Sequence, residues 1–133
     1  MALAVSLEHY AEKNNSPEAA ILGEALDDAT EAFLENDKSP SRKVNEIDTR
    51  GSHFYLAFYW AKELSKQEKS QELKATFERV YAALSDNKDK ILQELLDAQG
   101  SKQDIGGYYL PKNEEASKAM RPSETFNKVL EGI

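Results

Sequence analysis

The fold is decided by residues 54–61, which read Phe-Tyr-Leu-Ala-Phe-Tyr-Trp-Ala and hold five of the chain's twelve aromatic residues. Ser52 precedes this stretch and can cap a helix. A helix built from these residues carries apolar side chains in every direction, so it has to be buried on all sides. We therefore predict a central helix here. The other helices of so short a chain can cover it only in part, which indicates that further polypeptide packs against it.

Apolar residues at helical spacing predict more helices on both sides of this central one. Residues 1–13 place several apolar residues on one face with no capping residue before them. That pattern is typical either of a helix cut in its middle or of a native end that frays. The next helix opens at Ser16-Pro17-Glu18 and should end near Glu35. On the C-terminal side we predict helices over residues 73–84, from Ser85 to Gly100, over residues 114–120, and for a last turn or two after Pro122.

The composition agrees with a helical domain. The chain has 133 residues, of which 40% are hydrophobic, with 6 Gly, 4 Pro and no Cys. We predict an all-α fold, a single helical unit over residues 1–133 with about five main helices around the aromatic one. The formal charge of −7 excludes a basic nucleic-acid binder. The longest nearly unbroken apolar run and the uncharged start fit neither a membrane span nor a signal peptide, so we expect no membrane contact and a cytoplasmic location.

Helical periodicity disappears between residues 36 and 51, where we predict a long loop. Such loops are uncommon in small domains and are often functional. Its segment 38–43 reads Lys-Ser-Pro-Ser-Arg-Lys, three cations and two hydroxyls without an acid in an otherwise acidic chain. Arginine can bind phosphate oxygens through two N–H groups at once, and lysines and serines add charge and donors. From these residues alone, the loop is either a solvated surface segment or an anion site.

Other chemical groups are sparse. His9 and His53 lie far apart in the sequence, and no nucleotide-binding or zinc-protease motif occurs. We expect His53 to be a hydrogen-bonded residue at a helix end, and the acidic pairs Asp27-Asp28 and Glu114-Glu115 to be surface charge. Gly106-Gly107, followed by Tyr108 and Tyr109, reads either as a turn anchored by the two rings or as a close approach to a ligand. We predict no catalytic residue and no metal ligand in this chain.

Several segments together resemble the C-terminal end of the bacterial monomeric, NADP-dependent isocitrate dehydrogenases. The resemblance covers essentially the whole chain, and the order of its motifs is highly specific. The motifs are Ala-Val-Ser-Leu-Glu-His at 4–9, Lys-Ser-Pro-Ser-Arg-Lys-Val at 38–44, Arg-Gly-Ser-His-Phe-Tyr-Leu-Ala at 50–57 with Tyr-Trp-Ala at 59–61, Asp-Ile-Gly-Gly-Tyr-Tyr at 104–109, and Arg-Pro-Ser at 121–123 with Thr-Phe-Asn at 125–127.

The resemblance implies an enzyme that oxidises and decarboxylates isocitrate to 2-oxoglutarate, with NADP and Mg²⁺ or Mn²⁺, in a cleft between two domains. This chain would be the C-terminal portion of the smaller domain, and the remainder of the parent enzyme would be its partner, with isocitrate and NADP bound by the whole. The metal carboxylates, the catalytic Tyr and Lys and most isocitrate ligands of the family belong upstream of this chain. We therefore expect the isolated chain to be inactive.

One site residue carries over from the family. The arginine of the Ser-Pro-Ser-Arg-Lys loop matches a ligand of the NADP 2′-phosphate, which assigns cofactor binding to Arg42. Lys38 and Lys43 should strengthen the local field without direct contact. The sequence departs from the family pattern at Asn45 and Thr49, where glycine and asparagine are expected, and these differences bear on the shape of the loop.

A second interpretation is a stand-alone, non-catalytic helical interaction module derived from that enzyme, which binds a partner through the aromatic helix or the loop. Its mark would be a native gene product of this length. In both interpretations, apolar patches that the rest of the enzyme would cover should favour self-association of the isolated chain.

Overall fold

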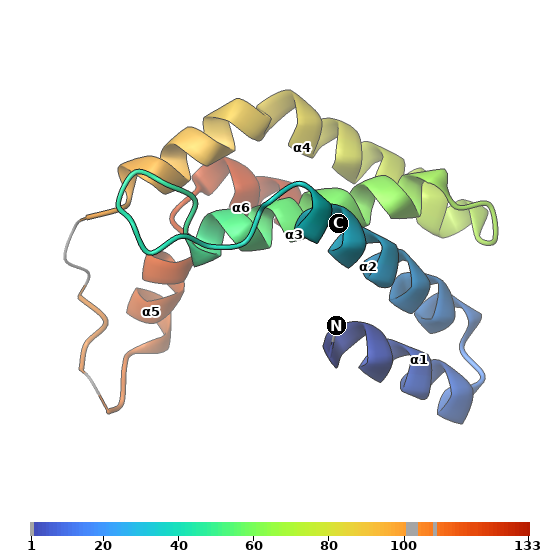
Figure 1. Ribbon diagram of the computed structural model, residues 1–133. Coiled ribbons are helices and arrows are strands. Elements are labelled where there is room, and N and C mark those ends of the chain that lie inside the picture. The colour runs from blue at the N-terminus through green and yellow to red at the C-terminus, as the bar shows by residue number, and fades with distance from the viewer. Residues whose placement is uncertain (1, 101–103, 108) are drawn as a thin grey trace.

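The computed structural model describes residues 2–100, 104–107 and 109–133, and all regular secondary structure in these ranges is helical (Figure 1). The predicted all-α class is therefore confirmed, with four long helices and two short ones. None of the helices in the described ranges is long and apolar enough to span a membrane. The helices are α1 (Ala2–Asn14), α2 (Pro17–Glu35), α3 (Thr49–Lys66), α4 (Gln71–Asp97), α5 (Asn113–Met120) and α6 (Glu124–Glu131).

The predicted cap of the aromatic helix is wrong. Helix α3 begins at Thr49, and its N-cap is Asp48, whose carboxylate accepts a hydrogen bond of 2.9 Å from the backbone N–H of Gly51. Ser52 lies inside the first turn, where its hydroxyl donates to the carbonyl of Lys38 at 2.6 Å. Both Asp and Ser are good caps, but Asp48 has the extended backbone of a cap, whereas the hydroxyl of Ser52 donates to the carbonyl of Lys38.

The predicted break at Ser85 is also wrong, because α4 runs through it without interruption. Serine is tolerated inside a helix, and no glycine or proline stops the chain there. The buried residues Val80, Leu84, Ile91 and Leu95 keep one apolar stripe along the whole helix. The predicted terminator holds, since Gly100 has a φ of 74° just beyond the helix end.

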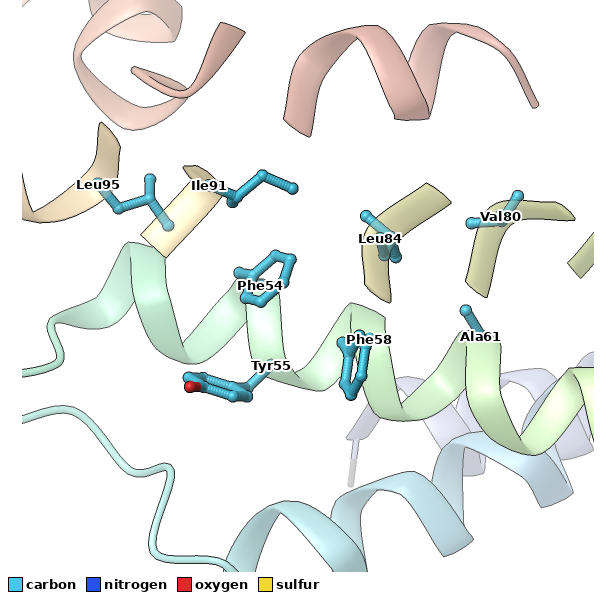
Figure 2. Close-up of a cluster of buried hydrophobic side chains, with 8 residues drawn as sticks. All are labelled: Phe54, Tyr55, Phe58, Ala61, Val80, Leu84, Ile91 and Leu95. Atoms are coloured by element: carbon cyan, nitrogen blue, oxygen red, sulfur yellow. The ribbon is translucent and has the colours of Figure 1, made fainter. Parts of the chain in front are cut away.

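The core lies between α3 and α4, with α2 on the other side of α3 and α6 beside α4 (Figure 1). Phe54 is completely buried and lies between the two helices, close to Ile91 and Leu84 (Figure 2). The prediction that α3 is buried on all sides is only partly correct. Four of its apolar residues remain partly exposed, namely Leu56, Ala57, Tyr59 and Trp60. The largest buried cluster consists of Phe54, Tyr55, Phe58, Ala61, Val80, Leu84, Ile91 and Leu95.

Glu94 fastens the C-terminal helix to α4. Its carboxylate accepts hydrogen bonds from the hydroxyl of Ser123 at 2.5 Å, the hydroxyl of Thr125 at 2.8 Å and the backbone N–H of Thr125 at 3.3 Å. Burial of Glu94 raises its pKa, but these donated bonds outweigh burial and the pKa is lowered overall. The predicted packing face of the last helix is confirmed for Phe126 and Val129, which pack against the core cluster.

Candidate functional site

The predicted long loop joins α2 to α3 over residues 36–48 and lies beside the C-terminal end of α4 (Figure 1). Its first part is held by α2 and α3. The backbone N–H of Lys38 donates to the carbonyl of Phe33 at 3.2 Å, and the carbonyl of Lys38 accepts from Ser52. The ammonium of Lys38 lies 4.4 Å from the centre of the Tyr55 ring, a cation–π contact. Lys38 is therefore fixed against α3.

The middle of the loop closes on itself. The backbone N–H of Ser41 donates to the carbonyl of Ile47 at 2.7 Å, and the hydroxyl of Ser41 donates to the carboxylate of Glu46 at 2.5 Å. The same hydroxyl accepts from the backbone N–H of Lys43 at 3.1 Å, and the ammonium of Lys43 lies 4.0 Å from Glu46. Glu46 thus accepts a hydrogen bond from the hydroxyl of Ser41 and lies near the ammonium of Lys43, two groups that the sequence suggested as phosphate donors.

Arg42 stands at the turn of this closed loop. Its side chain is exposed, and it makes no hydrogen bond or ion pair with the described residues. A guanidinium carries five N–H donors in a rigid fork. None of the five is used by the described residues, so all are available to a group that approaches from outside the chain.

Arg50, in contrast to Arg42, is paired within the fold. Its guanidinium forms a 2.8 Å ion pair with the carboxylate of Asp48, and its side chain is only 15% exposed. A second N–H group donates to the carbonyl of Ala119 at 3.1 Å. Arg50 therefore ties the start of α3 to the end of α5, and its donors are committed within the fold.

The far side of the loop is held from α4 by a residue that the sequence analysis missed. The side-chain oxygen of Gln99 accepts from the backbone N–H of Asn45 at 2.7 Å, and its amide nitrogen donates to the carbonyl of Glu46 at 2.6 Å. Asn45 has a φ of 69°, in the left-handed region that glycine prefers and that asparagine tolerates better than most residues. The departure from glycine at this position is therefore compatible with the loop shape.

A cavity of about 210 Å³ lies under the loop, between it and helices α3 and α4. Its walls combine apolar side chains from the helices with polar groups from the loop. Arg42 is not among the lining residues, so the guanidinium lies outside this cavity. The lining residues are Asp37, Lys38, Asn45, Ile47, Asp48, Gly51, Tyr55, Leu92, Leu95, Leu96 and Gln99.

The histidines form no site in the described part of the chain. His9 is exposed on α1, and His53 is exposed on the first turn of α3. The expectation that His53 is hydrogen-bonded is wrong with respect to the described residues. Within those same residues, no group of three or more His, Asp or Glu side chains is arranged to hold a metal ion.

The acidic pair Asp27-Asp28 is exposed on α2, as predicted for surface charge. The pKa of Asp28 is raised, first by burial and then by the nearby carboxylates of Glu63 and Glu24, while Lys69 opposes the shift. These groups lie where α2 faces the end of α3, around a hollow that does not include the long loop.

The glycine turn is confirmed, but its anchoring is not. Gly106 has a φ of 80° and donates its N–H to the carboxylate of Asp104 at 2.9 Å. A Cβ at Gly106 would stand 2.6 Å from Cγ of Lys112, so the close approach is to this chain's own side chain. Tyr109 is 90% exposed and does not anchor the turn in the core, and Tyr108 lies outside the described residues.

Comparisons with known proteins point in one direction. A family model described as monomeric isocitrate dehydrogenase matches residues 1–131. The isocitrate dehydrogenase (NADP) of Azotobacter vinelandii is 53% identical to the chain over 130 residues, which are 98% of the chain and 18% of that protein. Isocitrate dehydrogenase (NADP) 2 of Colwellia maris is 52% identical over 133 residues, and that of Mycobacterium tuberculosis is 46% identical over 133 residues. The chain spans 18% of the length of each of these relatives.

Proposed function

Because this chain belongs to the monomeric isocitrate dehydrogenase family, we propose that it is the C-terminal segment of an NADP-dependent isocitrate dehydrogenase and that Arg42 binds the cofactor's 2′-phosphate. The parent enzyme would oxidise and decarboxylate isocitrate to 2-oxoglutarate in the cytoplasm. This chain would supply part of the NADP site and part of the scaffold of the smaller domain.

The observation that carries this proposal is the contrast between Arg42 and the cations around it. Lys38 is stacked on Tyr55, and Lys43 lies near Glu46, whereas the guanidinium of Arg42 is exposed and unpaired with respect to the described residues. The 2′-phosphate is the group that separates NADP from NAD, and a planar guanidinium can bind two of its oxygens at once. The residues present therefore fit a phosphate.

The chemical step requires groups beyond those described here. NADP, when bound, accepts the hydride from isocitrate, and Arg42 would hold the far end of that cofactor and so orient it. No candidate set of metal ligands occurs among the described residues, so they do not fit Mg²⁺ or Mn²⁺. We propose that the metal, the isocitrate and the catalytic groups are held by the remainder of the parent enzyme, and that this chain alone is inactive.

We also propose that the rest of the enzyme packs against the exposed apolar side chains of α1. Leu3, Val5 and Tyr10 on this helix are 54%, 63% and 56% exposed. Leu3, Leu7 and Tyr10 follow helical spacing on one face of α1, and an apolar face that is open to solvent is typical of an interaction surface. In the isolated chain the same surface would favour self-association. In the alternative function, a stand-alone interaction module, a partner would bind through the aromatic helix α3 or the loop.

The proposed function is tested by putting this chain in place of the matching segment of a relative. The matching 18% of the Azotobacter vinelandii relative is exchanged for this chain, and reduction of NADP by isocitrate is measured in the resulting fusion enzyme. We expect activity in the fusion, no activity in the relative truncated before this segment, and no activity in this chain alone. An inactive fusion that is folded by circular dichroism would contradict the proposal and favour the interaction module.

A further inference from the structure

We propose that Gln99 is the positioning residue of the Arg42 loop, and that it sets from the end of α4 how well the enzyme distinguishes NADP from NAD. This inference rests on the proposed function of Arg42. It assigns Gln99 no contact with the cofactor. Gln99 acts through the loop backbone, which carries the arginine.

Gln99 is itself well placed to act as an anchor. It follows the last turn of α4, and its backbone N–H donates to the carbonyl of Leu96 at 3.0 Å. Its side chain is half-buried at the wall of the cavity under the loop. Both polar ends of its amide are used, one by the N–H of Asn45 and the other by the carbonyl of Glu46. Two consecutive loop residues are therefore held by one side chain.

The connection from Gln99 to Arg42 is short and continuous. Gln99 holds the backbone of Glu46, and the carboxylate of Glu46 holds the hydroxyl of Ser41. Ser41 precedes Arg42, and its hydroxyl also accepts from the N–H of Lys43, which follows Arg42. Both chain neighbours of Arg42 are thus tied to a network that ends on α4.

The side chain of Arg42 has no partner of its own in the described chain, so its direction depends on the backbone beneath it. Without the hydrogen bonds from Gln99, the loop would adopt several conformations, and only one of them would place the guanidinium correctly for a phosphate. The affinity for a phosphate then falls in proportion to the fraction of time that the loop spends in that arrangement. Groups elsewhere that bind the nicotinamide end or isocitrate are unaffected.

The first test measures the anchor directly in the full chain. Gln99→Met keeps the size of the side chain and removes both hydrogen bonds. Gln93→Met is the matched control, because Gln93 lies on α4 six residues before Gln99, is exposed, and its side chain bonds only to Asp97 among the described residues. We expect the amide of Asn45 to exchange with solvent about tenfold faster in Gln99→Met and at the original rate in Gln93→Met. Unchanged exchange at Asn45 would overturn the inference.

The second test measures the consequence in the fusion enzyme. Gln99→Met should raise the KM for NADP about three- to tenfold, while kcat and the use of NAD stay as they were. A residue that merely stabilises the fold would lower kcat with both cofactors, and that result would overturn the inference. So would an unchanged KM for NADP.

Combining the substitutions separates the two proposals. In an Arg42→Ala background, Gln99→Met should have no further effect on the KM for NADP, because the group it positions is gone. An additive effect would show that Gln99 acts elsewhere and would overturn the inference alone. If Arg42→Ala leaves NADP and NAD use unchanged, the proposed role of Arg42 fails, and the positioning role for specificity fails with it, whatever the amide exchange of Asn45 shows about the anchor.

Discussion

The hydroxyl of Ser123 donates to the carboxylate of Glu94 at 2.5 Å and accepts the backbone N–H of Phe126 at 3.1 Å, so one buried group both caps α6 and joins it to α4. Ser123 is only 1% exposed. A buried serine with both functions occupied contributes more than an exposed cap, because its partly buried partners are less readily solvated than exposed groups when the hydroxyl is removed.

Ser123→Ala should therefore lower the free energy of unfolding by about 1 to 3 kcal/mol, from the lost cap and the lost hydrogen bond to Glu94. Urea unfolding followed by circular dichroism measures the change. Ser117→Ala is the control, because Ser117 is exposed on α5, and it should stay within about 0.5 kcal/mol of the original protein. Equal losses in both variants would contradict this account of α6.

The acid stability of the chain should depend on Glu94. Although burial raises its pKa, the bonds from Ser123 and Thr125 lower it below the usual 4.5. The folded state therefore binds this proton less readily than the unfolded state, so the contribution of Glu94 is complete above the unfolded pKa and is lost as the pH falls through the folded pKa. Glu94→Gln should be less stable than the original protein near pH 7, and the difference should shrink toward about pH 3. A difference that is constant with pH would refute the assignment.

The positions of the helices could be predicted from the sequence wherever they depend on neighbouring residues. The helical spacing on each side of Ser85 and the cap at Ser16 both depend on residues within a few turns, and both are observed. Ser52 and Ser85 were misread because serine is a good cap and also a tolerated interior residue. In the fold, Asp48 caps α3 while Ser52 bonds to the carbonyl of Lys38, and α4 packs continuously past Ser85.

Some features of the loop could also be predicted from the sequence, and others could not. Its length and the exceptional charge of residues 38–43 were visible in the sequence, and so was Arg42 once the family motif was found. The neutralising role of Glu46 and the anchor at Gln99 were not visible. Gln99 and Asn45 are separated by 54 positions, and a single glutamine after a helix carries no signal of its own. Such pairs are set by tertiary packing, which periodicity and composition do not report.

The turn at Gly106 should require glycine. Its φ of 80° is one that side chains rarely adopt, and a Cβ there would stand 2.6 Å from Cγ of Lys112. Gly106→Ala should cost about 1 to 2 kcal/mol in the free energy of unfolding or open the turn. Gly132→Ala is the matched control, since Gly132 has a φ of −82° and its Cβ would meet atoms no closer than 3.5 Å. Thermal unfolding of the two variants should separate them, and an equal response would argue against the turn described here.

Removing the guanidinium of Arg42 should change cofactor preference without changing the fold. In the fusion enzyme, Arg42→Ala should weaken use of NADP by about 1.5 to 3 kcal/mol in kcat/KM, the value of one charge-assisted contact, while kcat/KM for NAD barely changes. Arg42→Lys should recover part of the loss, because an ammonium restores the charge but not the paired donors. Arg79→Ala is the control, since Arg79 is exposed on α4 away from the loop. Steady-state kinetics with both cofactors measures the effect, and an equal loss with NADP and NAD would show that Arg42 does not contact the 2′-phosphate.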